Sequence, residues 1–143
     1  MMDDITYSIL IAGNPTKLRF DVEAMADIEQ NLELMAMGLG GKKSFFTLLD
    51  PPYDIREMAV LLMHGINGAN RFEKIDNRLN LNDAKALLQK HFFSLMEGVT
   101  TAQDFTTKQA NFMGEISKAA RIGVGFREAV KQPEKQEATP QNQ

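Results

Sequence analysis

The sequence predicts an α+β protein that is mainly helical, in which an N-terminal β-hairpin is followed by four to five helices and a disordered C-terminal tail. Apolar residues alternate at period two near the N-terminus, which is typical of a strand with one buried face. From residue 21 onward, apolar residues recur at spacings of three and four, which indicates amphipathic helices. Residues 131–143 contain one alanine and no larger apolar side chain, so they cannot bury enough surface to offset the entropy of ordering.

The hairpin is predicted over residues 5–20. One face of a first strand, over residues 5–12, carries four apolar side chains: Ile5, Tyr7, Ile9 and Ile11. Residues 13–16, Gly-Asn-Pro-Thr, form turns readily, and Leu18 and Phe20 then share one face of a second strand. We therefore expect a loop of about four residues. An isolated hairpin is marginal in water, so this one must pack on helices or on another chain.

The first helix is predicted over residues 22–38. Asp21 is expected to cap it, and Glu23 lies in the first turn, where the helix dipole favours acids. The apolar stripe of this helix has four members: Met25, Ile28, Leu32 and Met35. The glycines that follow, at 38, 40 and 41, are expected to end the helix, because glycine readily takes the left-handed conformation.

Two further helical segments are expected in the middle of the chain. Residues 44–49 are predicted to form one or two turns that stop before Pro51 and Pro52. Asp54 is then expected to cap a longer helix, with Glu57 completing a capping box. Its predicted stripe has five members: Ile55, Met58, Ala59, Leu62 and Ile66. The glycines at 65 and 68 predict that this helix ends near them.

The last two helices follow a polar stretch over residues 70–80. Asn80 or Asn82 is expected to cap the first of them, which runs to Gly98 with six apolar residues inside: Leu81, Ala84, Leu87, Leu88, Phe92 and Leu95. The other begins at Thr101 or Ala102 and runs to Val130, with a thinner stripe: Phe105, Phe112, Ile116 and Ala119.

Glycines at 114, 123 and 125 weaken this last predicted helix, because each costs up to about 1 kcal/mol relative to alanine. We therefore expect it to kink, to break or to form only against a partner. The predicted domain organisation is a single domain over residues 1–130, in which residues 101–130 attach loosely, followed by the tail over residues 131–143.

Composition and charge narrow the function classes. The chain has 143 residues, no cysteine and a net charge of −3, so disulfides and thiolate chemistry are excluded and no basic face for nucleic acid is expected. The acidic N-terminus lacks the features of a secretory signal, and no apolar run approaches the roughly 20 residues of a membrane span. These observations favour a cytoplasmic protein without nucleic-acid or membrane partners.

Residue patterns typical of catalysis are missing. His64 and His91 fall on separate predicted helices without a metal-binding pattern, and they are expected to be ordinary helix residues. The serines and glycines match neither a nucleophile turn nor a phosphate-binding loop. Four acids gather on the first helix, where they are expected to solvate a face: Asp21, Glu23, Asp27 and Glu29. The sequence therefore predicts no enzyme, no cofactor and no metal.

Methionine and phenylalanine indicate a binding surface, since the chain has nine of each and methionine suits surfaces that adapt to a partner. Among those that fall outside the predicted stripes, six are expected to be partly exposed: Met37, Phe45, Phe46, Met63, Phe93 and Met96. The alternative is a core that is wider than the stripes. We also expect self-association through the edge of the hairpin and through the region of Phe45 and Phe46.

The order of elements and several residues resemble the phage tail assembly chaperones, and most closely the branch found with gene transfer agents. A Leu-Arg-x-x-x-x-Ala-x-x-x-x-Glu pattern opens the first helix of that branch and is matched here by four residues: Leu18, Arg19, Ala24 and Glu29. A later helix with a glycine is matched by Leu61, Leu62, Gly65 and Ile66, and an Asp-Ala helix start by Asp83 and Ala84. The resemblance covers residues 5–97 and does not extend to residues 100–130 or to the tail.

The resemblance implies a function in assembly. Proteins of this family coat the tape measure protein while the tail tube polymerises around it, and they are absent from the finished particle. The implied partners are therefore the tape measure protein and the tail tube protein. Two alternatives stay open: a structural tail or head component that remains in the virion, and a small helical DNA-binding regulator, which would need a basic helix face that the sequence does not show.

Overall fold

The computed structural model describes residues 4–35 and 44–126, and it confirms an α+β fold that is mainly helical with an N-terminal hairpin. The elements in chain order are β1 (Thr6–Ile11), β2 (Asn14–Arg19), α1 (Val22–Met35), the 3-10 helix η1 (Phe45–Leu48), α2 (Ile55–Phe72), α3 (Leu81–Met96) and α4 (Ala102–Gly123). Met37, the glycines at 38, 40 and 41, residues 127–130 and the predicted tail over 131–143 lie outside the described residues.

The two strands pair in antiparallel fashion, but the loop between them is shorter than the sequence predicts. Only Ala12 and Gly13 connect the strands, with φ values of 52° and 80°. Two consecutive positive φ values are typical of the tight turn that matches the twist of a hairpin. The predicted four-residue loop is therefore wrong, because Asn14, Pro15 and Thr16 belong to β2.

Pro15 is compatible with a strand here because of its place in the ladder. It lies opposite Leu10, next to the Ile11–Asn14 pair that adjoins the turn. Antiparallel pairs alternate between hydrogen-bonded and non-hydrogen-bonded positions, so the nitrogen of Pro15 points away from β1 and no ladder bond is lost.

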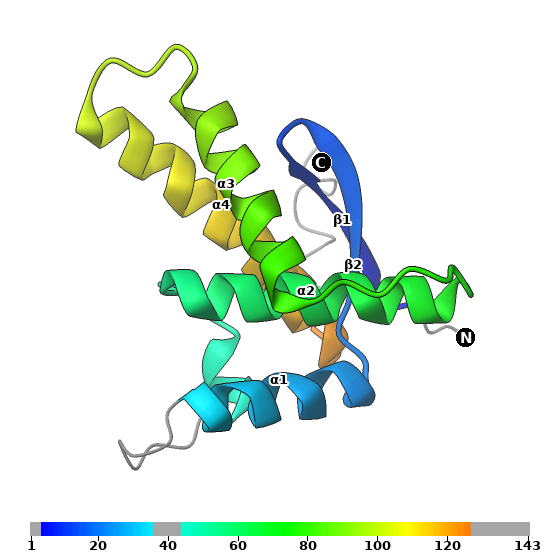
Figure 1. The fold of residues 1–143 in the computed structure, drawn as a ribbon. Helices are drawn as coiled ribbons and strands as arrows, with labels where there is room; N and C mark the ends of the chain where they lie inside the picture. The colour runs from blue at the N-terminus through cyan, green and yellow to red at the C-terminus, as the bar shows by residue number, and fades with distance from the viewer. Residues whose placement is uncertain (1–3, 36–43, 127–143) are drawn as a thin grey trace, which may run out of the picture.

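The helix α1 begins where the cap predicts. The Asp21 carboxylate accepts a hydrogen bond from the Ala24 amide at 2.9 Å. The buried face of α1 carries Ala24, Ile28 and Leu32, and this face packs against α2. Figure 1 shows α1 running beneath α2, with η1 beside the later end of α1.

The helix α2 is the central element of the fold. Asp54 and Glu57 form the predicted capping box at its start. Every residue over 57–69 is buried, so α2 is covered on all sides, by the hairpin, α1, α3 and α4. The single predicted stripe therefore underestimates the buried surface, and its first member, Ile55, is 59% exposed.

The predicted end of α2 near its glycines is wrong, because the helix continues to Phe72. These glycines permit close approach of β2. A Cβ on Gly65 would lie 2.9 Å from the Phe20 ring, and one on Gly68 would overlap the backbone carbonyl of Arg19. The packing of β2 against this face outweighs the weak helix propensity of glycine.

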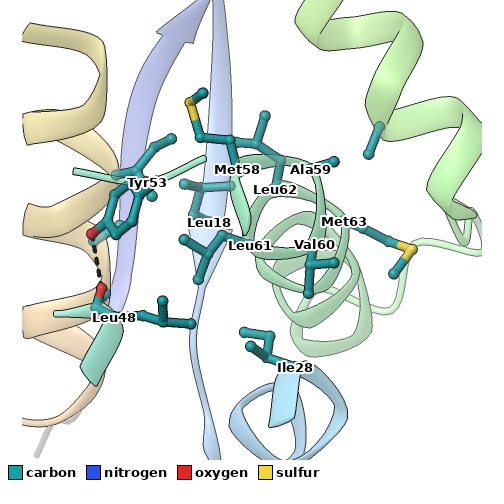
Figure 2. Packing of buried hydrophobic residues seen from close by; sticks show 14 of the residues in the cluster. Leu18, Ile28, Leu48, Tyr53, Met58, Ala59, Val60, Leu61, Leu62 and Met63 are labelled. Atoms are coloured by element: carbon teal, nitrogen blue, oxygen red, sulfur yellow. Dashed lines mark hydrogen bonds between the residues drawn. The ribbon is translucent and has the colours of Figure 1, made fainter. Parts of the chain in front are cut away.

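The core lies between α2 and the elements around it, as Figure 2 shows for Leu18, Ile28 and Leu62. Tyr53 is buried at its edge, and its hydroxyl donates a hydrogen bond to the Leu48 carbonyl at 2.8 Å. The predicted helical turns over residues 44–49 are confirmed as η1, which brings Leu48 and Phe45 into this core.

The helix α3 begins at one of its two predicted caps, and α4 begins where the sequence predicts. Asn80 and Asp83 form a capping box on α3, and Thr101 caps α4. The helix α4 is continuous through Gly114, so the predicted break is wrong, and it ends at Gly123 rather than at the predicted Val130. Its second half buries Ile116, with Ala119 and Ala120, in the core. Gly123 lies against the neighbouring β2–α1 junction, because a Cβ there would approach the Phe20 carbonyl oxygen to 2.6 Å.

Candidate functional site

Residues 92–111, which we call the arm, form the longest stretch of the described chain without a buried residue. The arm comprises the end of α3, the connection to α4 and the first half of α4, and none of its residues is buried. Figure 1 shows it extending away from α1 and α2. It nevertheless exposes two large apolar side chains, Phe93 at 67% and Met96 at 51%. Exposed apolar groups that lie close together often belong to an interface.

The expected exposure of the six candidate interaction residues holds for three of them. Phe46, Phe93 and Met96 are each more than half exposed. The expectation is wrong for Phe45, which packs its ring 5.6 Å from the ring of Phe20, and for Met63, which is buried in α2. The wider core therefore accounts for these two, and Met37 lies outside the described residues.

The three exposed members do not form one patch. Phe46 lies on η1 beside α1, whereas Phe93 and Met96 lie on α3 on the other side of α2. The arm is thus the place where two predicted interaction residues come together.

A cleft of about 310 Å³ lies where β1, α3 and α4 meet, and we call it the β1–α3–α4 cleft. Its apolar lining comes from Leu10, Leu95 and Phe112. Leu10 is 60% exposed because it points to the opposite face of β1 from the buried Ile9 and Ile11. The sequence contains one signal for this cleft, which is the apolar Leu10 on the outer face of the first strand. The period-two pattern identifies only the buried face of that strand, so it does not draw attention to Leu10.

His91 joins the hairpin to α3 at the wall of this cleft. Its Nδ1 accepts a hydrogen bond from the Ala12 amide at 2.9 Å, so the neutral ring carries its proton on Nε2. Among the described residues, Nε2 has no hydrogen-bond partner. The ring packs on Phe112 with centroids 3.9 Å apart, and burial lowers the pKa of His91 below its ordinary value.

The charged groups of the cleft differ in how they are paired. Glu115 accepts hydrogen bonds from the Tyr7 hydroxyl and from Lys118, both at 3.1 Å. Burial raises the pKa of Tyr7 to about 12, so this hydroxyl stays a donor at neutral pH. Lys108 also lines the cleft and makes no ion pair within the described part of the chain. The cleft therefore carries one positive charge that the described residues leave unbalanced.

The other histidine, His64, lies in the interior between α1 and α2. Its Nε2 is 2.5 Å from the Asn31 side-chain oxygen, and the residue is buried. Burial lowers its pKa, although the Asp27 carboxylate opposes this shift. Within residues 4–35 and 44–126, no three His, Asp or Glu side chains gather in a way that could hold a metal ion.

The acids on α1 have structural partners. Asp21 caps the helix and also pairs with Arg71 at 2.9 Å, and Glu23 pairs with the same arginine at 3.2 Å. Glu29 accepts a hydrogen bond from the Phe45 amide at 2.7 Å, which ties η1 to α1. These contacts connect α1 to the end of α2 and to η1.

Most residues that carry the family resemblance have a role in the fold. Leu18, Ala24, Leu61, Leu62 and Ala84 are buried, and Asp83 completes the capping box of α3. Arg19 packs its guanidinium 3.8 Å from the centre of the Phe72 ring. The resemblance thus rests on positions that build the fold, whereas Leu10, His91 and Lys108 around the cleft lie outside the matched positions.

Comparison with known proteins adds no relative. No family model, no curated protein and no solved structure matches the chain. Among the helices of the described residues, none has the length and apolar character needed to cross a membrane.

Proposed function

We propose that this chain is a phage tail assembly chaperone, which binds the tape measure protein in the host cytoplasm during tail tube assembly and acts without catalysis. The observation that carries the proposal is the arm, because it presents Phe93 and Met96 to solvent from a chain in which residues 57–69 of α2 are all buried. The order of elements and the matched positions of the family resemblance support the same assignment.

The chemistry of the arm suits a partner that must be released. Phe93 and Met96 are surrounded on the exposed face of α3 by polar residues such as Gln89, Lys90 and Glu97. An apolar centre with a polar rim is typical of protein interfaces, and a contact of small area gives weak and transient binding. A chaperone that gives way to arriving tube subunits needs binding of this kind.

The direct test is co-expression with the tape measure protein encoded in the same genome. We expect the two proteins to purify together. Replacing Phe93 and Met96 together by serine should weaken this association by about thirtyfold or more, since exposed aromatic and apolar contacts at an interface centre contribute about 1–2 kcal/mol each and about 1.4 kcal/mol corresponds to tenfold in affinity. The matched control is Val22→Ser, which removes an apolar side chain that is 78% exposed on α1. Equal binding by the arm variant and the control would contradict the proposal.

A second experiment separates a chaperone from a virion component. Mass spectrometry of purified particles should find the tube protein and the tape measure protein but not this chain. Stoichiometric amounts of the chain in the particle would instead establish the structural alternative.

A further inference from the structure

We propose that the β1–α3–α4 cleft is the docking site for one large apolar side chain with a neighbouring carboxylate, both carried by a helix of the tape measure protein. This inference rests on the proposed function and identifies where and how the partner is recognised. The cleft shares Leu95 and Lys108 with the arm, but it lies on the face of α3 opposite to Phe93, because two residues along a helix correspond to a rotation of about 200°.

The size of the cleft limits what it accepts. Its volume of about 310 Å³ lies at the lower end of the range for ligand pockets, which is roughly 300–1,000 Å³. A space of this size suits one or two side chains of a protein partner better than a larger organic ligand. The exposed Leu10 and the partly buried Leu95 would gain most from coverage by an apolar group.

The charges of the cleft indicate the second part of the ligand. Lys108 lacks an ion pair in the described residues, while Glu115 is already paired with Lys118. An incoming carboxylate would therefore balance Lys108 without competing for a partner.

The buried nitrogen of His91 gives an independent indication of a ligand. Only 6% of His91 is exposed, and within the described ranges its Nε2–H has no acceptor. Buried polar groups are nearly always hydrogen-bonded, so this unpaired donor, which is itself shielded from solvent, indicates that an acceptor reaches it when the side chains of the cleft wall shift on binding. A carboxylate supplies acceptor oxygens for this donor as well as negative charge for Lys108.

The walls of the cleft favour a helical occupant over an extended one. An added strand would need a row of free backbone groups, and two of the three walls, α3 and α4, make their backbone hydrogen bonds internally. The third wall, β1, pairs with β2 along one edge and lines the cleft with the Leu10 side chain. A helix needs only a groove for the side chains on one of its faces. This is the usual mode by which an apolar helix face docks beside other helices.

The first test replaces Leu10 by glutamate and measures binding to the co-expressed tape measure protein. We expect Leu10→Glu to lower the affinity at least tenfold, because it places a charge on the apolar wall and repels the incoming carboxylate. Ile55→Glu is the matched control, since Ile55 is 59% exposed against 60% for Leu10 and lies at the start of α2, away from the cleft. The control should stay within about twofold of wild type. Circular dichroism verifies that both variants are folded.

The second test reverses the free charge. Lys108→Glu should lower the affinity severalfold at low salt. The difference should be smaller at 0.5 M salt, because the Debye length there is ~3–5 Å and the attraction between Lys108 and the partner's carboxylate is screened. Lys85→Glu is the control, because Lys85 is exposed on α3, does not line the cleft and lies outside the arm.

The possible outcomes separate this inference from the proposed function. If wild-type chain does not bind the tape measure protein, both fail. If wild type binds and a folded Leu10→Glu variant binds equally well, the cleft inference is overturned and the proposed function stands. If Leu10→Glu instead abolishes self-association in light scattering and leaves tape measure binding unchanged, a second copy occupies the cleft and the inference is likewise overturned.

Discussion

The helix α2 and the arm are both helical, yet they differ completely in burial. Residues 57–69 of α2 are all buried, whereas none of residues 92–111 is. Most of the stability of a helix in a protein comes from packing of its faces, and α2 obtains that packing on every side. The helices of the arm depend more on their own ends and on each other, through the Thr101 cap and through an edge-to-face contact of Phe92 with Phe105 at 6.5 Å.

This difference separates two tasks within one small chain. The part around α2 supplies the free energy that keeps the chain folded, so its residues are constrained by volume. The arm contributes little buried surface, so its apolar residues are free to serve a partner. Mutations should therefore divide into those that change stability and those that change binding.

The largest difference is expected between Leu62→Ala and Phe93→Ala. Leu62 is fully buried, so its truncation should lower the free energy of unfolding by about 2–5 kcal/mol. Phe93 is 67% exposed, and its truncation should change that quantity by no more than about 0.5 kcal/mol. Urea unfolding followed by circular dichroism measures both. Similar losses for the two variants would remove the distinction between α2 and the arm.

The next effect concerns two helical glycines. Gly68→Ala should cost about 3 kcal/mol, because the new Cβ would overlap the Arg19 carbonyl and either β2 or α2 must shift. Gly114→Ala is the control, since a Cβ there meets no atom within 4 Å, and it should stabilise the chain by up to about 1 kcal/mol. Thermal melts of the two variants should move in opposite directions.

A smaller loss is expected for Tyr53→Phe. This change removes the hydrogen bond to the Leu48 carbonyl and leaves the buried ring in place. The expected cost is about 1 kcal/mol, with part of it arising from the unsatisfied carbonyl. Thr106→Val in the arm removes a hydrogen bond of similar kind, from its hydroxyl to the Ala102 carbonyl, but at an exposed site. Urea midpoints should therefore shift for the first variant and stay near wild type for the second.

The smallest effect is a dependence of stability on pH. Burial lowers the folded-state pKa of both His64 and His91 below the ordinary value of about 6.5. Below pH 6.5 the unfolded chain therefore binds more protons than the folded chain. The histidine contribution to the free energy of unfolding is complete above this pH and is lost as the pH falls through the folded-state values.

Urea midpoints measured between pH 8 and pH 5.5 test this dependence. They should decline toward acid pH in wild type and decline less in a His64→Gln, His91→Asn double variant, in which the asparagine oxygen can still accept from the Ala12 amide. A midpoint that rises toward acid pH in wild type would contradict the sign.

Local chemistry explains which elements could be predicted from the sequence. Asp21, Asp54 and Thr101 begin their helices because a side-chain oxygen satisfies a nearby backbone amide, and such contacts need only a few consecutive residues. The end of α2 could not be predicted in the same way. Gly65 and Gly68 stay helical because β2, from a distant part of the chain, lies against them.

The candidate site shows the same division. The exposure of Phe93 and Met96 follows from their positions outside an apolar stripe, whereas Met63 is buried because α2 has neighbours on every face. A helical stripe assumes one buried face, so it cannot anticipate a central helix. The cleft could not be predicted from the sequence for a related reason. Leu10 and Lys108 are far apart in the chain, and only the packing of β1 against α4 brings them to the same cleft.

The packing of Phe20 has a consequence for how the chain is synthesised. Phe20 is fully buried, and it lies between Gly65 of α2 and Gly123 of α4. Gly123 is synthesised about 100 residues after Phe20. At a translation rate of roughly 5–20 residues per second, the hairpin waits on the order of 5–20 s for the helix that closes over it. During this interval Phe20 of the nascent chain is not yet covered by α4. Folding of the domain is therefore completed only after α4 has emerged.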